Sequence, residues 1–217
     1  MIGVARPTRG VEFAESAQSI ERNLAGFQYV TERSWDKSIP DCFNDVTSAL
    51  LAQPTDLIWF VEEDVVVPPG AFALLLNEIN NGADIAVVNY FLKKQEGVLS
   101  VKKDEDDNIL WVSLGCTLVK ASVFSKIEYP WFRIGYTGAQ RHCGSSCIKR
   151  TWHLVKNDYP YGGQDCYFSW KAREAGCKIV SVDAVVADHL IIEELGMPDN
   201  NVGCHKIKRV KRIRGSK

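Results

Sequence analysis

Three acidic residues stand at the end of an apolar segment. The run Leu57–Val61 holds five apolar residues, two of them aromatic, and Glu62, Glu63 and Asp64 follow directly. Such a run predicts a central strand covered on both faces, and ligands of open α/β sheets bind at the carboxyl ends of strands. Because side chains alternate along a strand, Glu62 and Asp64 are expected on one side, where they could share Mg²⁺ or Mn²⁺. The alternative is that these acids end the strand in solvent.

Strands and helices alternate in the sequence up to about residue 90. Short apolar runs are bounded by Pro and Gly, and the longer segments between them have apolar residues at helical spacing. This order predicts an α/β fold with a mostly parallel central sheet flanked by helices. The expected strands lie near residues 2–5, 27–32, 57–61 and 84–90, and the expected helices near 13–24, 43–51 and 72–79.

The second half of the chain has a different pattern. Two short apolar segments within residues 98–120 flank a polar turn, and a short helix is expected to end near Ile127. Residues 130–164 have no clear period and are rich in Gly, Tyr, Trp and Cys, which is typical of a functional loop or lid. A helix over 164–175 and a last strand region over 179–186 follow.

Composition favours one large domain. The chain has 217 residues, 46% of them hydrophobic and 24% charged, which suits a single α/β domain over residues 1–205. Residues 206–217 contain seven Lys and Arg and no acid, so this basic tail is expected either to contact a polyanion or to be a solvated end. We see no apolar run long enough to span a bilayer and no signal peptide, so we predict a soluble, cytoplasmic protein.

Seven cysteines are scattered without regular spacing, which argues against a disulfide framework. The tightest group, His142, Cys143, Cys147 and His153, could bind zinc, although its spacing matches no common zinc finger. Whether this group binds a metal stays open.

Three segments after the acidic strand carry further motifs. Val112–Lys120 carries a glycine turn at Gly115, Tyr161–Gly176 carries Gln164 and Asp165 before a helix, and Ile179–His189 is an apolar run that closes on a histidine. Together with the acidic strand, these motifs follow the order found in family 2 glycosyltransferases of the GT-A fold. The chain resembles this family over residues 2–190, and small single-domain members occur in phages as well as in cells, where the host cytoplasm would be the site of action.

The resemblance implies a metal-dependent inverting glycosyltransferase with a nucleotide-diphosphate sugar as donor. Asp64 and His189 would bind Mn²⁺ or Mg²⁺, and Asp165 would be the catalytic base. Glu62 stands where the family has its first Asp, and Gly115 would line the sugar and acceptor pocket. The residues alone leave simpler roles open, because Asp165 could cap a helix, His189 could be structural and Gly115 could form a bend.

The resemblance also implies the nucleotide-binding residues. Pro7, Thr8 and Arg9 would form the loop that meets the base and ribose, Glu32 would contact the base, and Asn44 would lie near the nucleotide. A loop Arg or a strand-end Glu is also commonly just solvated.

The acceptor cannot be read from the sequence, since a saccharide, a protein hydroxyl, a lipid carrier and a hydroxymethylated DNA base all present a reactive oxygen. The basic tail tilts the expectation slightly towards a polyanion. Aromatic residues of the long loop, Tyr136, Trp152, Tyr159 and Tyr161, could stack on a sugar or base. Two other classes remain open: a GT-A-like binding module that has lost catalysis, and a nucleic-acid-binding protein acting through residues 206–217.

Overall fold

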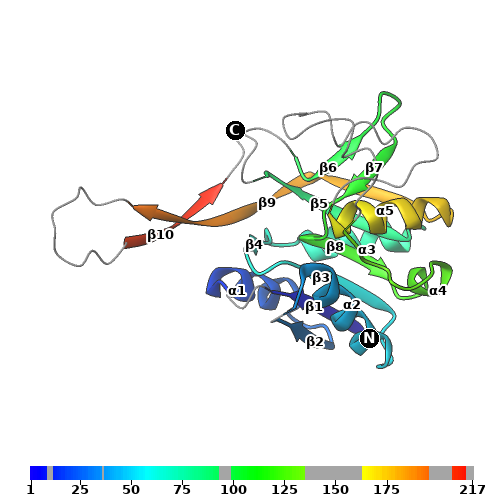
Figure 1. Ribbon diagram of the computed structural model, residues 1–217, viewed down its shortest axis with the longest axis horizontal. Coiled ribbons are helices and arrows are strands. Elements are labelled where there is room, and N and C mark those ends of the chain that lie inside the picture. Colours follow the sequence, from blue (N-terminus) through cyan, green and yellow to red (C-terminus); the bar gives the residue numbers. More distant parts are fainter. Residues whose placement is uncertain (9–11, 36, 93–98, 135–162, 196–206, 214–217) are drawn as a thin grey trace.

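A computed structural model of the chain describes residues 1–8, 12–35, 37–92, 99–134, 163–195 and 207–213. It shows a mixed α/β fold in which a twisted sheet is flanked by helices, so the predicted α/β class is confirmed (Figure 1). The sheet runs in the order β10-β9-β5-β8-β3-β1-β2, with β4 paired to β9, and a separate hairpin is made of β6 and β7. Among the described helices, none is long and apolar enough to span a membrane.

The first half of the sheet is parallel, as the sequence predicted. Strand β1 (Ile2–Pro7) pairs in parallel with β2 (Tyr29–Ser34) on one side and β3 (Leu57–Val61) on the other. The strand that follows β3 in the sheet, β8 (Cys116–Lys120), is antiparallel to both β3 and β5 (Ile85–Tyr90). The sheet is therefore less parallel than predicted, because β8 returns between two strands that run the same way.

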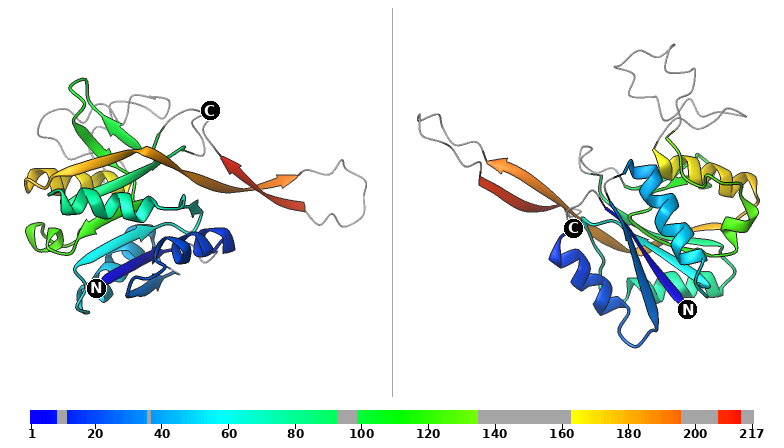
Figure 2. Two further views of the ribbon diagram at one scale, coloured as in Figure 1. Left: turned by 180° about the vertical axis from the view of Figure 1, so that it is seen from behind. Right: turned by 60° about the horizontal axis from the view of Figure 1, so that its bottom comes forward.

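Helices cover both faces of the sheet (Figure 2). One core cluster joins the inward residues of β1 and β3 to α1 (Ala14–Asn23) and α3 (Ala71–Asn80). The cluster on the opposite face brings in α2 (Ile39–Leu51), α4 (Val123–Lys126) and α5 (Gln164–Glu174). Residues buried on both faces explain why the β3 run is continuously apolar.

A long strand, β9 (Ile179–Leu195), leaves the sheet. It pairs in parallel with β5 up to Ala187, and its later residues pair with the two-residue strand β4 (Val65–Val66) and with β10 (Ile207–Ile213). The β9–β10 pair projects from the body as a two-stranded ribbon (Figures 1 and 2). Most of the predicted basic tail is thus a strand of the sheet, since residues 207–213 lie in β10.

The ribbon is anchored at its base by ion pairs. Arg212 of β10 bonds Asp188 of β9, with 3.2 Å between Nη1 and Oδ2, and also bonds Glu15 of α1. The pair with Asp188 joins the two strands of the ribbon, and the pair with Glu15 joins β10 to α1. The four cysteine and histidine residues of the possible zinc set and the four loop aromatics lie outside the described residues, as does Arg9.

Candidate functional site

The acidic residues form a turn whose backbone is held on several sides. Strand β3 ends at Val61, and the N–H of Val65 donates to the Glu62 carbonyl at 3.3 Å. The Glu62 N–H donates to Gly115, and the Asp64 carbonyl accepts from Leu190 at 2.7 Å. From α1, the Ser16 hydroxyl donates to the Glu62 carbonyl at 3.2 Å. The backbone of the acidic turn is therefore held by the protein itself.

The charges of the acidic residues act on different neighbours. Those of Glu62 and Asp64 add to the raised pKa of Tyr90, whereas that of Glu63 partly opposes the lowering of the Arg6 pKa by burial. Residues 62–65 form a turn and do not continue β3, so strand alternation does not set the directions of these side chains. That Glu62 and Asp64 share a side stays a prediction.

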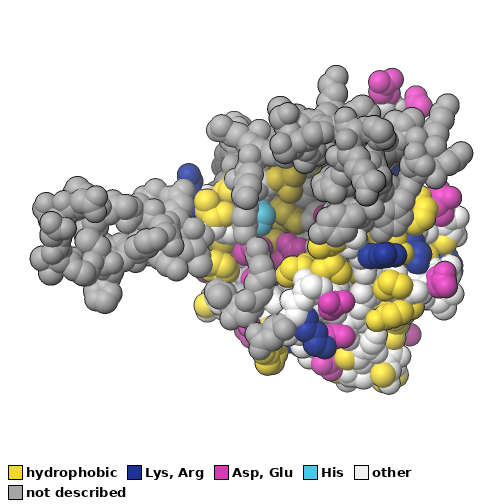
Figure 3. Space-filling model, in the orientation of Figure 1, with side chains coloured by type: hydrophobic (Ala, Val, Ile, Leu, Met, Phe, Trp, Pro, Cys, Tyr) yellow, Lys and Arg dark blue, Asp and Glu magenta, His cyan; other side chains and the backbone are white. Residues whose placement is uncertain are grey.

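Asp64 lies beside His189. The short pairing of β4 with β9 sets Val65 opposite His189, and 3.4 Å separates Asp64 Oδ1 from His189 Nε2. Both residues are buried, with 1% and 6% of their surface exposed. A histidine side chain is visible beside acidic side chains in the space-filling view (Figure 3). The structure therefore brings together the two predicted metal ligands, which are 125 residues apart in the chain.

The surroundings of His189 suit a cation ligand. Its Nδ1 lies 2.9 Å from the Phe91 carbonyl oxygen. A carbonyl only accepts, so Nδ1 must carry the proton and Nε2 faces the Asp64 carboxylate. Metal-binding histidines commonly fix their free nitrogen in this way, and two ligand atoms about 2.1 Å from one ion lie roughly 3 to 3.4 Å apart. The alternative is a protonated ring that donates to Asp64. Within the described residues, no group of three His, Cys, Asp or Glu side chains could hold a metal.

Asp165 lies at the start of α5. Its Oδ1 accepts the N–H of Cys166 at 2.9 Å, and burial raises the pKa of the carboxyl, an effect that this hydrogen bond partly opposes. A carboxylate with a raised pKa is a better proton acceptor near neutral pH than an ordinary aspartate. Gly163 leaves room for it, because a Cβ there would lie 2.8 Å from Asp165 Oδ1.

A chain of hydrogen bonds and one ring contact links α5 to the acidic turn. Ser169, one helical turn after Asp165, accepts the N–H of Val112 at 3.1 Å. The next residue, Ser113, bonds the Tyr90 hydroxyl. The Tyr90 ring in turn meets the His189 ring edge-to-face, with 4.9 Å between centroids. Sequence reasoning missed Ser113, Ser169 and Tyr90, because each looks like an ordinary residue of a strand or helix.

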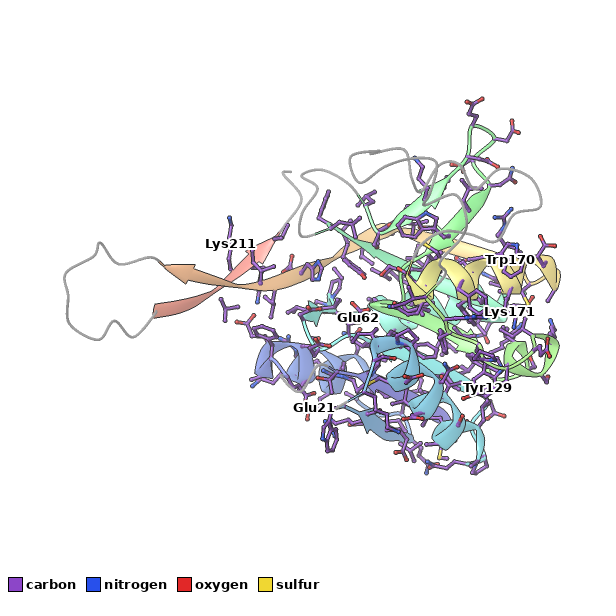
Figure 4. All side chains as sticks on the ribbon, in the orientation of Figure 1. Glu21, Glu62, Tyr129, Trp170, Lys171 and Lys211 are labelled. Carbon is purple, nitrogen blue, oxygen red and sulfur yellow. The ribbon has the colours of Figure 1, made fainter. Side chains whose placement is uncertain are left out.

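Three of the predicted carboxylates act on the hydroxyl of Tyr90. Burial raises the pKa of this phenol well above its usual range, and the charges of Glu62, Asp165 and Asp64 raise it further. The hydrogen bond to Ser113 opposes this rise. Figure 4 shows Glu62 near the middle of the molecule, with α5 on one side and α1 on the other.

The space in front of Gly115 is filled by a side chain of the protein. A Cβ at this position would lie 2.6 Å from the Tyr90 hydroxyl and from its ring, so the space in front of Gly115 is filled by Tyr90. The glycine is thereby explained without a substrate. Its predicted contact with the sugar stays a prediction.

The residues predicted at the nucleotide lie near the ends of β1 and β2. Pro7 ends β1, and the Thr8 N–H donates to Ser34 at 3.0 Å. Glu32 lies within β2 rather than at its end and accepts from Gln53 at 2.7 Å. None of these contacts tests the predicted binding of a nucleotide.

Asn44 has a clear structural task. Its amide nitrogen donates to the carbonyls of Pro40 and Phe132, and its oxygen accepts the N–H groups of Trp131 and Phe132. The side chain thus fixes residues 131–132 against α2. Its contact with a nucleotide remains a prediction, with few hydrogen-bonding positions left for it.

Arg6 is a buried cation that sequence reasoning passed over. It is 3% exposed, its Nη2 lies 2.8 Å from Glu12 and 3.3 Å from the Ser16 hydroxyl, and burial lowers its pKa. Ser16 relays this contact to the Glu62 carbonyl. The sequence does contain a signal for this arginine. It follows Ile2 and Val4 at the two-residue spacing of a strand, so it is expected on the same, buried face as these apolar residues.

Comparison with protein-family models and with curated proteins finds no match. Solved structures do match. A197 from STIV superposes with a TM-score of 0.62 at 20% sequence identity, covering 89% of this chain and 87% of that one. The chain shares the fold of A197. A 4-diphosphocytidyl-2C-methyl-D-erythritol synthase from Anaerococcus prevotii aligns with a TM-score of 0.41 at 8% identity, over 84% of this chain and 88% of that one, a likeness too weak to bear on fold or function.

Proposed function

We propose that this protein is a metal-dependent inverting glycosyltransferase of the GT-A fold that moves a sugar from a nucleotide-diphosphate donor to an acceptor hydroxyl. The observation that carries the proposal is the buried contact between Asp64 and His189, two predicted cation ligands that are distant in the chain. The predicted base, Asp165, has a raised pKa and lies on α5, which is bonded through Ser169 to the segment that holds Ser113, the partner of Tyr90. In this proposal the aspartate–histidine pair would supply ligands for a cation, and Asp165 would be the base.

Asp64 and His189 would hold Mn²⁺ or Mg²⁺, which when bound offsets the charge that builds on the departing diphosphate. Asp165 takes the proton of the acceptor hydroxyl. As it does so, the acceptor oxygen forms a bond to the anomeric carbon of the sugar, and the bond between that carbon and the diphosphate breaks. The raised pKa of Asp165 favours this step, because the base holds the proton better once it has taken it.

Two positions depart from the family pattern. Glu62 replaces an aspartate and Gln164 replaces a glutamate. The backbone N–H of Glu62 is bonded to Gly115, and the charge of Glu62 adds to the raised pKa of Tyr90. The longer side chain of Glu62 can reach a ribose hydroxyl or a water on the cation, so this replacement is compatible with donor binding. Gln164 begins α5, next to Asp165.

A panel of sugar nucleotides with Mg²⁺ or Mn²⁺ tests the proposal, scored by thermal stabilisation and by release of the nucleoside diphosphate. Asp64→Ala should lose both signals, and Asp165→Ala should keep donor binding but lose transfer. The exposed Asp56 offers a matched control as Asp56→Ala. Donor binding without any release by the native protein would favour the binding module. Release of pyrophosphate from a nucleoside triphosphate would instead indicate a nucleotidyltransferase.

The acceptor is proposed only as a class that bears a hydroxyl group. Contact with a polyanion would involve β10, because Lys211 projects from the ribbon on the side away from Glu62 (Figure 4). One basic residue of the ribbon, Arg212, is already bonded to Asp188 of β9 and to Glu15 of α1. Part of the positive charge of the tail is therefore already paired with acidic side chains of the same protein.

A further inference from the structure

Tyr90 occupies an unusual place between the two halves of the site. It is 2% exposed and ends β5. On one side its ring meets the ring of His189, with an interplanar angle of 71°. On the other side its hydroxyl bonds Ser113, and its ring fills the space in front of Gly115.

The backbone around Tyr90 is fixed as firmly as its side chain. Its N–H donates to the Ser100 hydroxyl at 3.0 Å, and its carbonyl accepts the Ser100 N–H at 2.9 Å. The following residue, Phe91, supplies the carbonyl that sets the tautomer of His189. The end of β5 therefore controls both the ring orientation and the proton position of the histidine.

The contact of Tyr90 with Ser113 connects it to the helix that carries the proposed base, Asp165. The Ser113 carbonyl accepts from Thr117, and its neighbour Val112 is bonded to Ser169 of α5, one turn beyond Asp165. A displacement of Tyr90 would thus act on two groups at once: the imidazole beside Asp64 and the strand on which the base helix is docked.

We propose that Tyr90 is a positioning residue that couples the cation pair Asp64–His189 to the segment that carries Asp165. This inference rests on the proposed function. The ring orients His189 for the cation, and the hydroxyl holds the Ser113–Gly115 turn against the acidic residues. Tyr90 does not itself exchange a proton with the substrate, since its hydroxyl is buried and bonded to Ser113.

Three variants separate the two tasks. Tyr90→Phe keeps the ring, so Mn²⁺ affinity, measured by calorimetry without turnover, should stay within about twofold of the native value while kcat falls about 10-fold or more. Tyr90→Leu loses the ring, so Mn²⁺ affinity should fall about 10- to 100-fold. Ser113→Ala should behave like Tyr90→Phe.

Phe72→Leu provides the matched control. Phe72 is a fully buried aromatic residue that packs on Trp59 and Phe27, so its loss removes ring packing without touching His189. This variant should be less stable but should bind Mn²⁺ as the native protein does. If Tyr90→Leu is too unstable to assay, Gly115→Ala supplies the test, because its new methyl group must displace the Tyr90 ring and should also weaken Mn²⁺ binding.

The outcomes distinguish this inference from the function on which it rests. Native protein and Tyr90→Leu that bind Mn²⁺ equally would overturn the inference and leave the glycosyltransferase standing. Unchanged kcat in both Tyr90→Phe and Ser113→Ala would remove the role of the hydroxyl. A native protein that binds neither Mn²⁺ nor Mg²⁺ would remove the cation site and, with it, the inference.

Discussion

His189 Nε2 lies 3.4 Å from Asp64 Oδ1, while the opposite ring nitrogen, Nδ1, lies 2.9 Å from the carbonyl of Phe91. The contact with the Phe91 carbonyl decides which nitrogen carries the proton, and so what His189 Nε2 presents to Asp64. Because Nδ1 must donate to the carbonyl, a neutral ring turns a lone pair towards a carboxylate, and a proton or a cation between these two acceptors would make the contact favourable.

Asp64→Asn and His189→Gln are therefore expected to weaken Mn²⁺ binding by at least about 100-fold, since each removes one of two proposed ligands. Titration calorimetry measures the effect directly. Asp188→Asn is the control, because Asp188 neighbours His189 in β9 but pairs with Arg212. Equal Mn²⁺ affinity in all three variants would leave the protonated ring as the explanation of the contact.

Asp165→Asn should retain donor binding and lose about 10²- to 10⁴-fold in transfer rate, which is the usual contribution of a general base. In the native protein, activity needs the carboxylate form. Burial raises the pKa of Asp165, so activity should fall on the acid side at a pH above the ordinary aspartate range of about 3.9. A pH profile of kcat/KM measures this limb. Asp165→Glu should keep an acid limb at a shifted pH, whereas a limb that survives in Asp165→Asn would belong to another group.

The same pKa shift predicts an effect on stability with a definite sign. The folded state raises the pKa of Asp165, so it binds the proton more tightly than the unfolded chain and loses stability as pH rises through the raised value. Asp165→Asn should consequently melt at a higher temperature than the native protein near neutral pH, and the difference should shrink towards pH 4. Thermal unfolding at several pH values checks this. A variant that is less stable at every pH would mean that the Cys166 N–H bond outweighs the cost of burial.

Much of the framework followed from apolar periodicity. The run that became β3 and the helical spacing of α2 and α3 were both readable, because each buries a face of local residues. The acidic turn could be found, but its geometry could not, since Glu62–Val65 leaves the strand pattern. The convergence of Asp64 with His189 depends on a two-residue strand, β4, that no local pattern marks.

Strand β10 shows why the rest was hidden. Its residues are mostly basic, and in the sequence they resemble a solvated tail. They form a strand because β9 offers a partner, and such pairing between distant segments is set by tertiary context rather than by composition. Tyr90 was missed for a similar reason, because its importance lies in contacts with Ser113, Gly115 and His189.

Deleting residues 206–217 should destabilise the protein, because it removes the strand paired with β9 together with both ion pairs of Arg212. Urea unfolding provides the measurement. Deletion of residues 214–217 alone leaves β10 intact and should have little effect, and Arg212→Gln should cost no more than about 1 kcal/mol, as expected for partly exposed ion pairs. A full deletion as stable as the native protein would show that β10 contributes little in solution.

Asn44 allows a test between a structural and a ligand-binding role. Its side chain makes four hydrogen bonds, two of them to the backbone N–H groups of Trp131 and Phe132. Asn44→Ala leaves these buried groups without their partner, so it should lower the free energy of unfolding by about 2 to 4 kcal/mol. Asn77→Ala, on the exposed side of α3, is the control. If Asn44 acts only on structure, donor KM should stay near the native value in the folded fraction. A large rise in donor KM, beyond what the loss of stability explains, would instead restore the predicted contact with the nucleotide.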